Sequence, residues 1–152
     1  MITPEYARTM ARYNAELNRR VYGAALRLSD AQRRSDEGAF WKSIHGTLSH
    51  LYWADRIWLS RFGAAQAPDV PIARSATMIE DFNSLWAQRQ DLDQVLIEWA
   101  DAMTPEEIAG DLSWHSGAVG RDMSKPRALL IMQIFNHQTH HRGQVHALIT
   151  RF

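Results

Sequence analysis

Apolar residues recur every three to four positions along four long segments of the chain, which is the period of an amphipathic helix. The segments span residues 4–28, 40–62, 75–103 and 126 to the end of the chain. In the third segment the spacing is close to a heptad, and Arg89 is the only polar residue at a repeating position. Four such helices in a chain of 152 residues predict an all-α fold, a four-helix bundle that forms one domain over residues 1–152.

The connections between these segments carry their own signals. Residues 29–32 (SDAQ) fit a capping box and predict a short helical turn, and 104–107 (TPEE) read as a helix start with proline in the first turn. Residues 63–74 contain two prolines and predict a crossing loop. Residues 110–126 are too rich in glycine and serine for a long helix, so we expect a short hairpin there, LSW against RDM, before the last helix.

The amino-acid composition argues against several classes of function. Seventeen basic residues balance seventeen acidic ones, and no run of Lys and Arg exceeds two, which argues against nucleic acid as a partner. No apolar stretch is long enough to span a membrane, and MITPEYARTM lacks the apolar core of a signal peptide, so a cytoplasmic protein is expected. With no cysteine, any metal must be held by nitrogen and oxygen ligands. The six tryptophans are expected mainly in the core or a dimer interface, with a substrate pocket as the less favoured alternative.

Four of the seven histidines lie between residues 137 and 146. On a helical wheel, His137 and His141 fall one turn apart at the edge of the apolar stripe, whereas His146 faces away. Two imidazoles at this spacing can share one metal ion. The pattern is weak by itself, because random placement of seven histidines gives roughly 0.3 such pairs. The alternative is a pair of water-bonded histidines at the margin of the core.

A third histidine strengthens the metal interpretation. His50 flanks the apolar stripe of the second helix in the same way as His137 flanks that of the fourth, while His45 is predicted to face solvent. Imidazoles at matching positions of two helices are what a three-His site in a bundle requires. The sequence therefore predicts metal ligation by His50, His137 and His141, although His50 alone reads better as a core-edge histidine.

Two charged residues interrupt the apolar stripes. Asp55 lies inside the stripe of the second helix, and Arg142 lies inside that of the fourth. An unpaired buried charge is costly, so we expect the two side chains to approach each other or a shared partner. The alternative is that one of them extends its charged end to water.

Four further polar residues are candidates for secondary roles. His140 could act as a hydrogen-bond partner of the ligands or as a proton shuttle, with simple surface exposure as the favoured alternative. Gln144 lies beside the ligands on the wheel and could contact metal-bound water or substrate. Asn14 and Asn18 lie one turn apart on the first helix, where they would orient a ligand or be solvated.

Two stretches of the sequence resemble the DinB-like (damage-inducible) family of four-helix-bundle metalloproteins. They are SIHGTLSHLYWADRIWLSRF and, farther along, FNHQTHHRGQVHALIT, and YNAELNRR in the first helix adds to the likeness. The resemblance implies a divalent metal, zinc or nickel most often, on His50, His137 and His141, and frequently a homodimer. The family includes bacillithiol S-transferases and, more distantly, a mycothiol-dependent maleylpyruvate isomerase. The family name is not evidence that its members bind DNA.

Three neutral imidazoles would leave a divalent metal with an open position and its full charge. Water or a thiol bound there loses its proton near neutral pH, which gives a nucleophile without a separate base. Gln138 follows His137 where an HExxH peptidase has glutamate, so that class is disfavoured. We expect a metal-dependent enzyme acting on a small molecule, such as a low-molecular-weight-thiol S-transferase or a hydrolase, with zinc or nickel ahead of manganese and iron. The alternatives are a noncatalytic metal- or ligand-binding stress-response protein and a bundle without metal.

Overall fold

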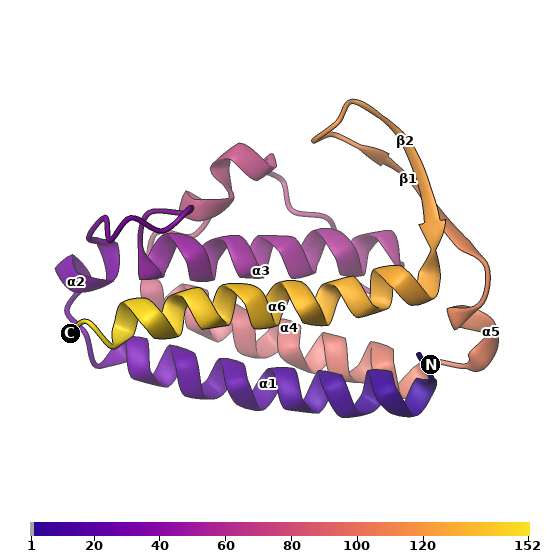
Figure 1. The fold of residues 1–152 in the computed structure, drawn as a ribbon, viewed down its shortest axis with the longest axis horizontal. Helices are drawn as coiled ribbons and strands as arrows, with labels where there is room; N and C mark the ends of the chain where they lie inside the picture. The colour runs from indigo at the N-terminus through magenta and orange to yellow at the C-terminus, as the bar shows by residue number, and fades with distance from the viewer. Residues whose placement is uncertain (1) are drawn as a thin grey trace.

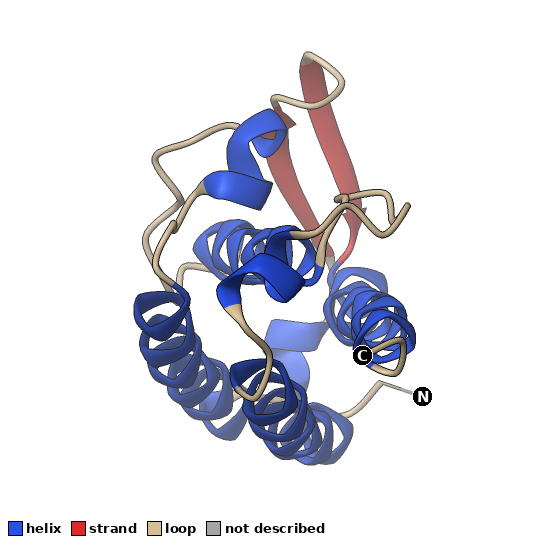
Figure 2. Cartoon of the chain, turned by 90° about the vertical axis from the view of Figure 1, so that its left-hand side faces the viewer, coloured by secondary structure: helices blue, strands red, loops and turns tan. Residues whose placement is uncertain are grey.

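The computed structural model describes residues 2–152, and the chain is mostly helical (Figure 1). Its four long helices are α1 (Pro4–Leu26), α3 (Ile44–Arg61), α4 (Phe82–Ala102) and α6 (Arg127–Ile149). Helices α1 and α3 each pack against both α4 and α6, and Figure 2 shows the four helices end-on around a shared interior. The four long helices that the apolar period predicts are all present.

Two of the predicted helix boundaries need correction. The third helix begins at Phe82 and not near residue 75, because the Asp81 side chain accepts a hydrogen bond from the Ser84 amide and caps the helix there. The residues before it form a separate 3₁₀ helix, η1 (Ile72–Thr77). The second helix begins at Ile44, where Ser43 caps it, and not near residue 40.

The short helices form where their capping boxes predict them. In α2 (Asp30–Arg34), Ser29 and Gln32 exchange the two reciprocal hydrogen bonds of the motif. In α5 (Pro105–Ile108), Thr104 and Glu107 do the same, with the proline in the first turn. Both turns thereby satisfy backbone amides that have no partner inside the helix.

The predicted hairpin is confirmed, in a different register. Strands β1 (Asp111–Ser116) and β2 (Arg121–Pro126) pair antiparallel, so that residues 112–114 face 123–125 and not 121–123. Gly120 closes the turn with a φ of 66° and donates its amide to the carbonyl of Ser116. The hairpin and η1 lie on the same side of the molecule, over α3 (Figures 1 and 2).

The centre of the molecule is apolar along most of its length and polar at one level. Small and branched side chains dominate the core, and alanines in α1 let its neighbours approach closely. Charged and amide side chains from all four long helices are buried among them. None of the helices within residues 2–152 combines the length and hydrophobicity needed to cross a bilayer.

Candidate metal centre

The structure brings together three histidines from two helices. His50 lies on α3, and His137 and His141 lie one turn apart on α6. One ring nitrogen of each lies within 4.8 Å of the others. The ring centroids of His137 and His141 are 4.5 Å apart, and that of His50 lies 5.4 Å and 5.1 Å from them. These are the three positions that the helical wheels selected.

The distance between two of the rings fits a shared cation. The Nε2 atoms of His137 and His141 are 3.1 Å apart. Two imidazoles on a tetrahedral zinc ion, each at about 2.0–2.1 Å, place their nitrogens about 3.3 Å apart. Two lone pairs directed at each other repel unless a proton or a cation lies between them. The donor set therefore suits a divalent ion of the zinc or nickel type.

His50 is held by residues outside the long helices. Its Nδ1 lies 2.9 Å from the hydroxyl of Ser75 in η1, which leaves Nε2 to face the other two rings. Ser49 donates to the carbonyl of Ser75 at 2.7 Å and so anchors η1 to α3. Trp41 stacks on the imidazole with centroids 4.0 Å apart. Hydrogen bonds of this kind fix the orientation and the tautomer of a metal-binding histidine.

Close backbone packing places Trp41 against His50. Lys42 has a φ of 70°, an uncommon conformation that tightens the turn leading into α3. Gly46 lies in the first turn of α3, and a Cβ at this position would overlap the carbonyl oxygen of Trp41. The glycine is therefore required for close contact, and a side chain here would push the Trp41 segment outward.

Gln144 holds the third ring. Its Oε1 accepts from Nδ1 of His141 at 2.7 Å, which leaves Nε2 of that ring to face His137. The Nε2 of Gln144 lies 3.2 Å from the exposed His140. Gln144 and His140, both predicted near the ligands, thus form a chain that leads from His141 to solvent. Nδ1 of His137 is buried and has no hydrogen-bond partner within residues 2–152.

Burial keeps the three imidazoles neutral. It lowers the pKa of His50 to about 3 and that of His137 to about 4, and the neighbouring rings add to both shifts. Burial also lowers the pKa of His141, although the bond to Gln144 opposes the shift. At neutral pH all three rings therefore present lone pairs, the form that binds a metal.

The three rings open onto a cavity of about 410 Å³ between α3, α6 and the hairpin. Its walls are largely aromatic, with Trp41, Trp53, Trp58 and Trp114 among the lining residues. No aspartate or glutamate within the described residues 2–152 lines it, and Arg61 is the sole lysine or arginine there. The tryptophans, expected mainly in the core or at a dimer interface, thus gather in good part around this cavity.

A buried polar network lies beside the three-His cluster and includes the two predicted asparagines. Arg142 donates to the side-chain oxygens of Asn14, Asn18 and Gln138, and Gln138 in turn donates to Asp55. The expectation that Asp55 and Arg142 meet at a shared partner is confirmed, and that partner is Gln138. Asn14 and Asn18 lie in this network, outside the three-His cluster.

The network closes into a ring through α4. Arg89 donates to Asp55 at 2.7 Å and pairs with Asp93 at 2.8 Å, and Asn18 donates to Asp93 at 2.9 Å. Burial raises the pKa of Asp55 to about 6, although Arg89 acts in the opposite direction. Two carboxylates thus balance the guanidinium groups of Arg89 and Arg142 in the interior.

The prediction for His45 is wrong. It is buried, and its Nε2 lies 2.8 Å from the carbonyl oxygen of Ile79. The wheel assumed that one face of α3 is covered, whereas η1 and α2 also pack against this helix. Sequence reasoning also missed the contacts of Ser75 and Trp41, because it placed both residues at the starts of long helices, whereas each lies in a segment that precedes its helix.

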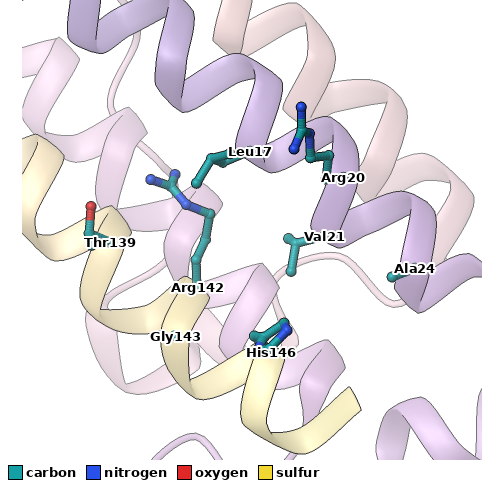
Figure 3. Close-up of a pocket in the computed structure, with 8 residues that line it drawn as sticks. All are labelled: Leu17, Arg20, Val21, Ala24, Thr139, Arg142, Gly143 and His146. Carbon is teal, nitrogen blue, oxygen red and sulfur yellow. The ribbon is translucent and has the colours of Figure 1, made fainter. Parts of the chain in front are cut away.

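A second cavity, of about 520 Å³, lies between α1 and α6 (Figure 3). Leu17 and Val21 of α1 face Arg142 and His146 of α6 across it. None of the three clustered histidines lines this space. The three-His cluster and this larger cavity are therefore separate features on different sides of α6.

Comparison with known proteins identifies the family. Searches of curated proteins and of solved structures found no match. The sequence model of the DinB family matches residues 1–151, which is nearly the whole chain. The motif resemblance and this match agree, and the chain belongs to the DinB family.

Proposed function

We propose that this protein binds one divalent metal ion, zinc or nickel, through His50, His137 and His141 and uses it as an enzyme on a small molecule. The convergence of three neutral imidazoles on one point, in the wall of a cavity, carries the proposal. A divalent cation there would lower the pKa of a coordinated thiol or water and supply a nucleophile at neutral pH. Transfer of a low-molecular-weight thiol to an electrophile is the favoured reaction, with hydrolysis second.

The residues around the site support such chemistry. Ser75 and Gln144 hold two of the rings in place, so a bound ion would meet ligands already arranged. The tryptophans give the cavity largely apolar walls, and electrostatic interactions are stronger beside apolar groups than in water. His140, exposed and bonded to Gln144, is placed to exchange a proton with solvent.

One observation favours a noncatalytic alternative. Within residues 2–152 the cavity lining contains no Asp, Glu, Lys, Tyr or Cys, so apart from the three histidines it offers no side chain of the usual acid–base types. A metal- or ligand-binding protein of the stress response needs none.

In either function we propose that the long helices form a four-helix bundle, one domain that pairs as a homodimer in the cytoplasm. Light scattering of the purified protein tests the dimer.

Metal analysis of protein purified without a histidine tag tests the proposal. We expect about one zinc or nickel per chain, and melting in chelator should reveal a stability loss of about 2.7 kcal/mol if metal is present at 100 times its dissociation constant. His141→Ala should lose the metal. His146→Ala is the matched control, because this exposed histidine lies on the same helix outside the cluster. Equal metal content in the two variants would overturn the assignment.

Turnover separates the enzyme from its alternative. The metal-loaded protein, offered a thiol and the electrophile monochlorobimane, should form the fluorescent conjugate faster than His141→Ala does. If metal binds but neither thiol conjugation nor hydrolysis exceeds the rate of the variant, the noncatalytic function stands instead.

A further inference from the structure

One face of α3 connects the metal centre to a distant cation. Six residues at the i, i+3, i+4, i+7, i+8 and i+11 positions of one helix face line the same cavity: His50, Trp53, Ala54, Ile57, Trp58 and Arg61. Arg61 lies eleven positions after His50, which corresponds to about 16 Å along the helix axis. The cavity therefore runs along α3 with the three-His cluster at one end and a guanidinium group at the other.

Arg61 is held in place without an ionic partner. Its guanidinium carbon lies 4.4 Å from the ring centre of Trp58 and 5.2 Å from that of Trp114, so two indoles fix the group by cation–π contact. The side chain is half-buried, and burial lowers its pKa. Within residues 2–152 it forms no ion pair and no hydrogen bond to another protein group. The exposed arginines Arg12 and Arg19, by contrast, each pair with a carboxylate.

The charges in the cavity all have one sign. A divalent ion at the histidines would add two positive charges to that of Arg61, and no lining carboxylate offsets them. Clefts of one charge sign with apolar walls concentrate ligands of the opposite sign. A planar guanidinium with free donors matches a carboxylate, which accepts two parallel hydrogen bonds from it. The tryptophans between the two ends would cover an apolar body.

We propose that the cavity selects carboxylic acids with an elongated apolar body, whose carboxylate pairs with Arg61 while the opposite end reaches the three histidines. This substrate class rests on the proposed metal function of the site. Arg61 would thus determine specificity at a distance from the reacting atoms. Binding energy at the carboxylate would orient the reactive end at the histidines, since the two ends belong to one molecule.

Matched thiols test the proposal on cobalt(II)-loaded protein. 8-Mercaptooctanoate and 8-mercaptooctanol share a thiol and a chain length and differ in charge, and the thiolate-to-cobalt absorption band reports the thiol at the metal. We expect the acid to bind at least tenfold more tightly than the alcohol. Arg61→Gln should reduce this ratio to near one without changing the cobalt content. Arg61→Lys should keep part of the preference, because it keeps the charge but loses the bidentate geometry.

Arg56→Gln is the matched control. Arg56 lies on the same helix and its guanidinium carbon is 5.7 Å from the ring centre of Tyr52, but it does not line this cavity. Its acid-to-alcohol ratio should equal that of the unaltered protein. A ratio near one in the unaltered protein, or an unchanged ratio in Arg61→Gln, would overturn the proposal.

Chain length provides a test that needs no substitution. Mercapto acids of four, eight and twelve carbons, compared with their alcohols on the unaltered protein, should show a charge preference that is strongest at one length and weak at four carbons. A preference that does not vary with length would refute a carboxylate site at a fixed distance from the metal.

The two proposals fail in distinguishable ways. If the protein binds no cobalt, the proposed metal function is wrong, and the Arg61 site can still be tested with 8-phenyloctanoate and 8-phenyloctanol through tryptophan fluorescence. A preference for the acid that Arg61→Gln abolishes would support the carboxylate site. Equal binding of the two compounds would overturn it.

Discussion

Replacing Ser75 with alanine should weaken metal binding without touching a ligand. Ser75 is fully buried in η1, and its hydroxyl forms the hydrogen bond to Nδ1 of His50 at 2.9 Å. In Ser75→Ala that nitrogen would be buried without a partner, because Trp41 covers one face of the ring. The imidazole would then lose the contact that fixes its tautomer and its rotation about the side chain.

Two independent magnitudes apply to this change. Loss of a hydrogen-bond partner that orients a metal-binding histidine typically costs 10- to 100-fold in metal affinity, equivalent to about 1.4–2.7 kcal/mol. A buried donor left without a partner costs about 1–3 kcal/mol of folding stability. We therefore expect zinc affinity to fall by 10- to 100-fold and the metal-free protein to lose about 1–3 kcal/mol.

Competition for zinc with a chromophoric chelator measures the affinity, and denaturant unfolding in excess chelator measures the stability. Thr77→Ala is the control, since its exposed hydroxyl lies in the same 3₁₀ helix and contacts only the carbonyl of Arg74. A zinc affinity of Ser75→Ala within threefold of that of Thr77→Ala would refute the idea that η1 organises the metal centre.

Three further substitutions test other parts of the structure by denaturant unfolding and metal titration. Arg89→Met should cost about 3–5 kcal/mol, because it leaves two buried carboxylates without their cation, whereas Arg12→Met, which removes an exposed pair, should change stability little; equal losses would contradict the buried network. Gly46→Ala should lower the free energy of unfolding by about 1–3 kcal/mol, because its methyl group overlaps a carbonyl oxygen. Gly23→Ala, in open space on α1, should raise it by up to about 1 kcal/mol, and a Gly46→Ala protein as stable as the unaltered protein would refute the close contact. Gln144→Ala should weaken zinc binding, but less than Ser75→Ala does, because its side chain is only partly buried and water can replace it; a larger effect than that of Ser75→Ala would contradict this order.

Periodicity predicted the parts of this structure that depend on one helix at a time. His50, His137 and His141 each lie at the edge of an apolar stripe, so the wheel of each helix located them. The same reasoning found Asp55 and Arg142, since a charge within an apolar stripe needs a partner. It could not name Gln138, because a glutamine on a helix is equally compatible with solvent.

Helical periodicity could not predict the contacts between a long helix and an irregular segment. His45 can be buried because its Nε2 has a hydrogen-bond partner in the carbonyl oxygen of Ile79, in the loop before α4. The hydroxyl of Ser75 reaches His50 because a 3₁₀ helix replaces the expected start of the third helix. The conformation of such segments is set by tertiary packing, and the helical period carries no information about it.

The three-His cluster and the buried network depend on each other through α6. His137 and His141 face the cavity, while Gln138 and Arg142, each one residue farther along, face the network. One residue corresponds to about 100° of rotation on a helix. The network lies on α1, α3 and α4 as well, so it specifies the rotation of α6 against the helix that carries His50. Any rotation that displaced the two histidines from His50 would also break the hydrogen bonds that join Gln138 to Asp55 and Arg142 to the asparagines of α1. It would leave a buried guanidinium and a buried carboxylate with fewer partners, which is costly. An apolar core of equal volume would tolerate such a rotation more readily, because apolar contacts are not directional. The charged interior therefore fixes where the two histidines of α6 meet His50, which apolar packing alone would not do.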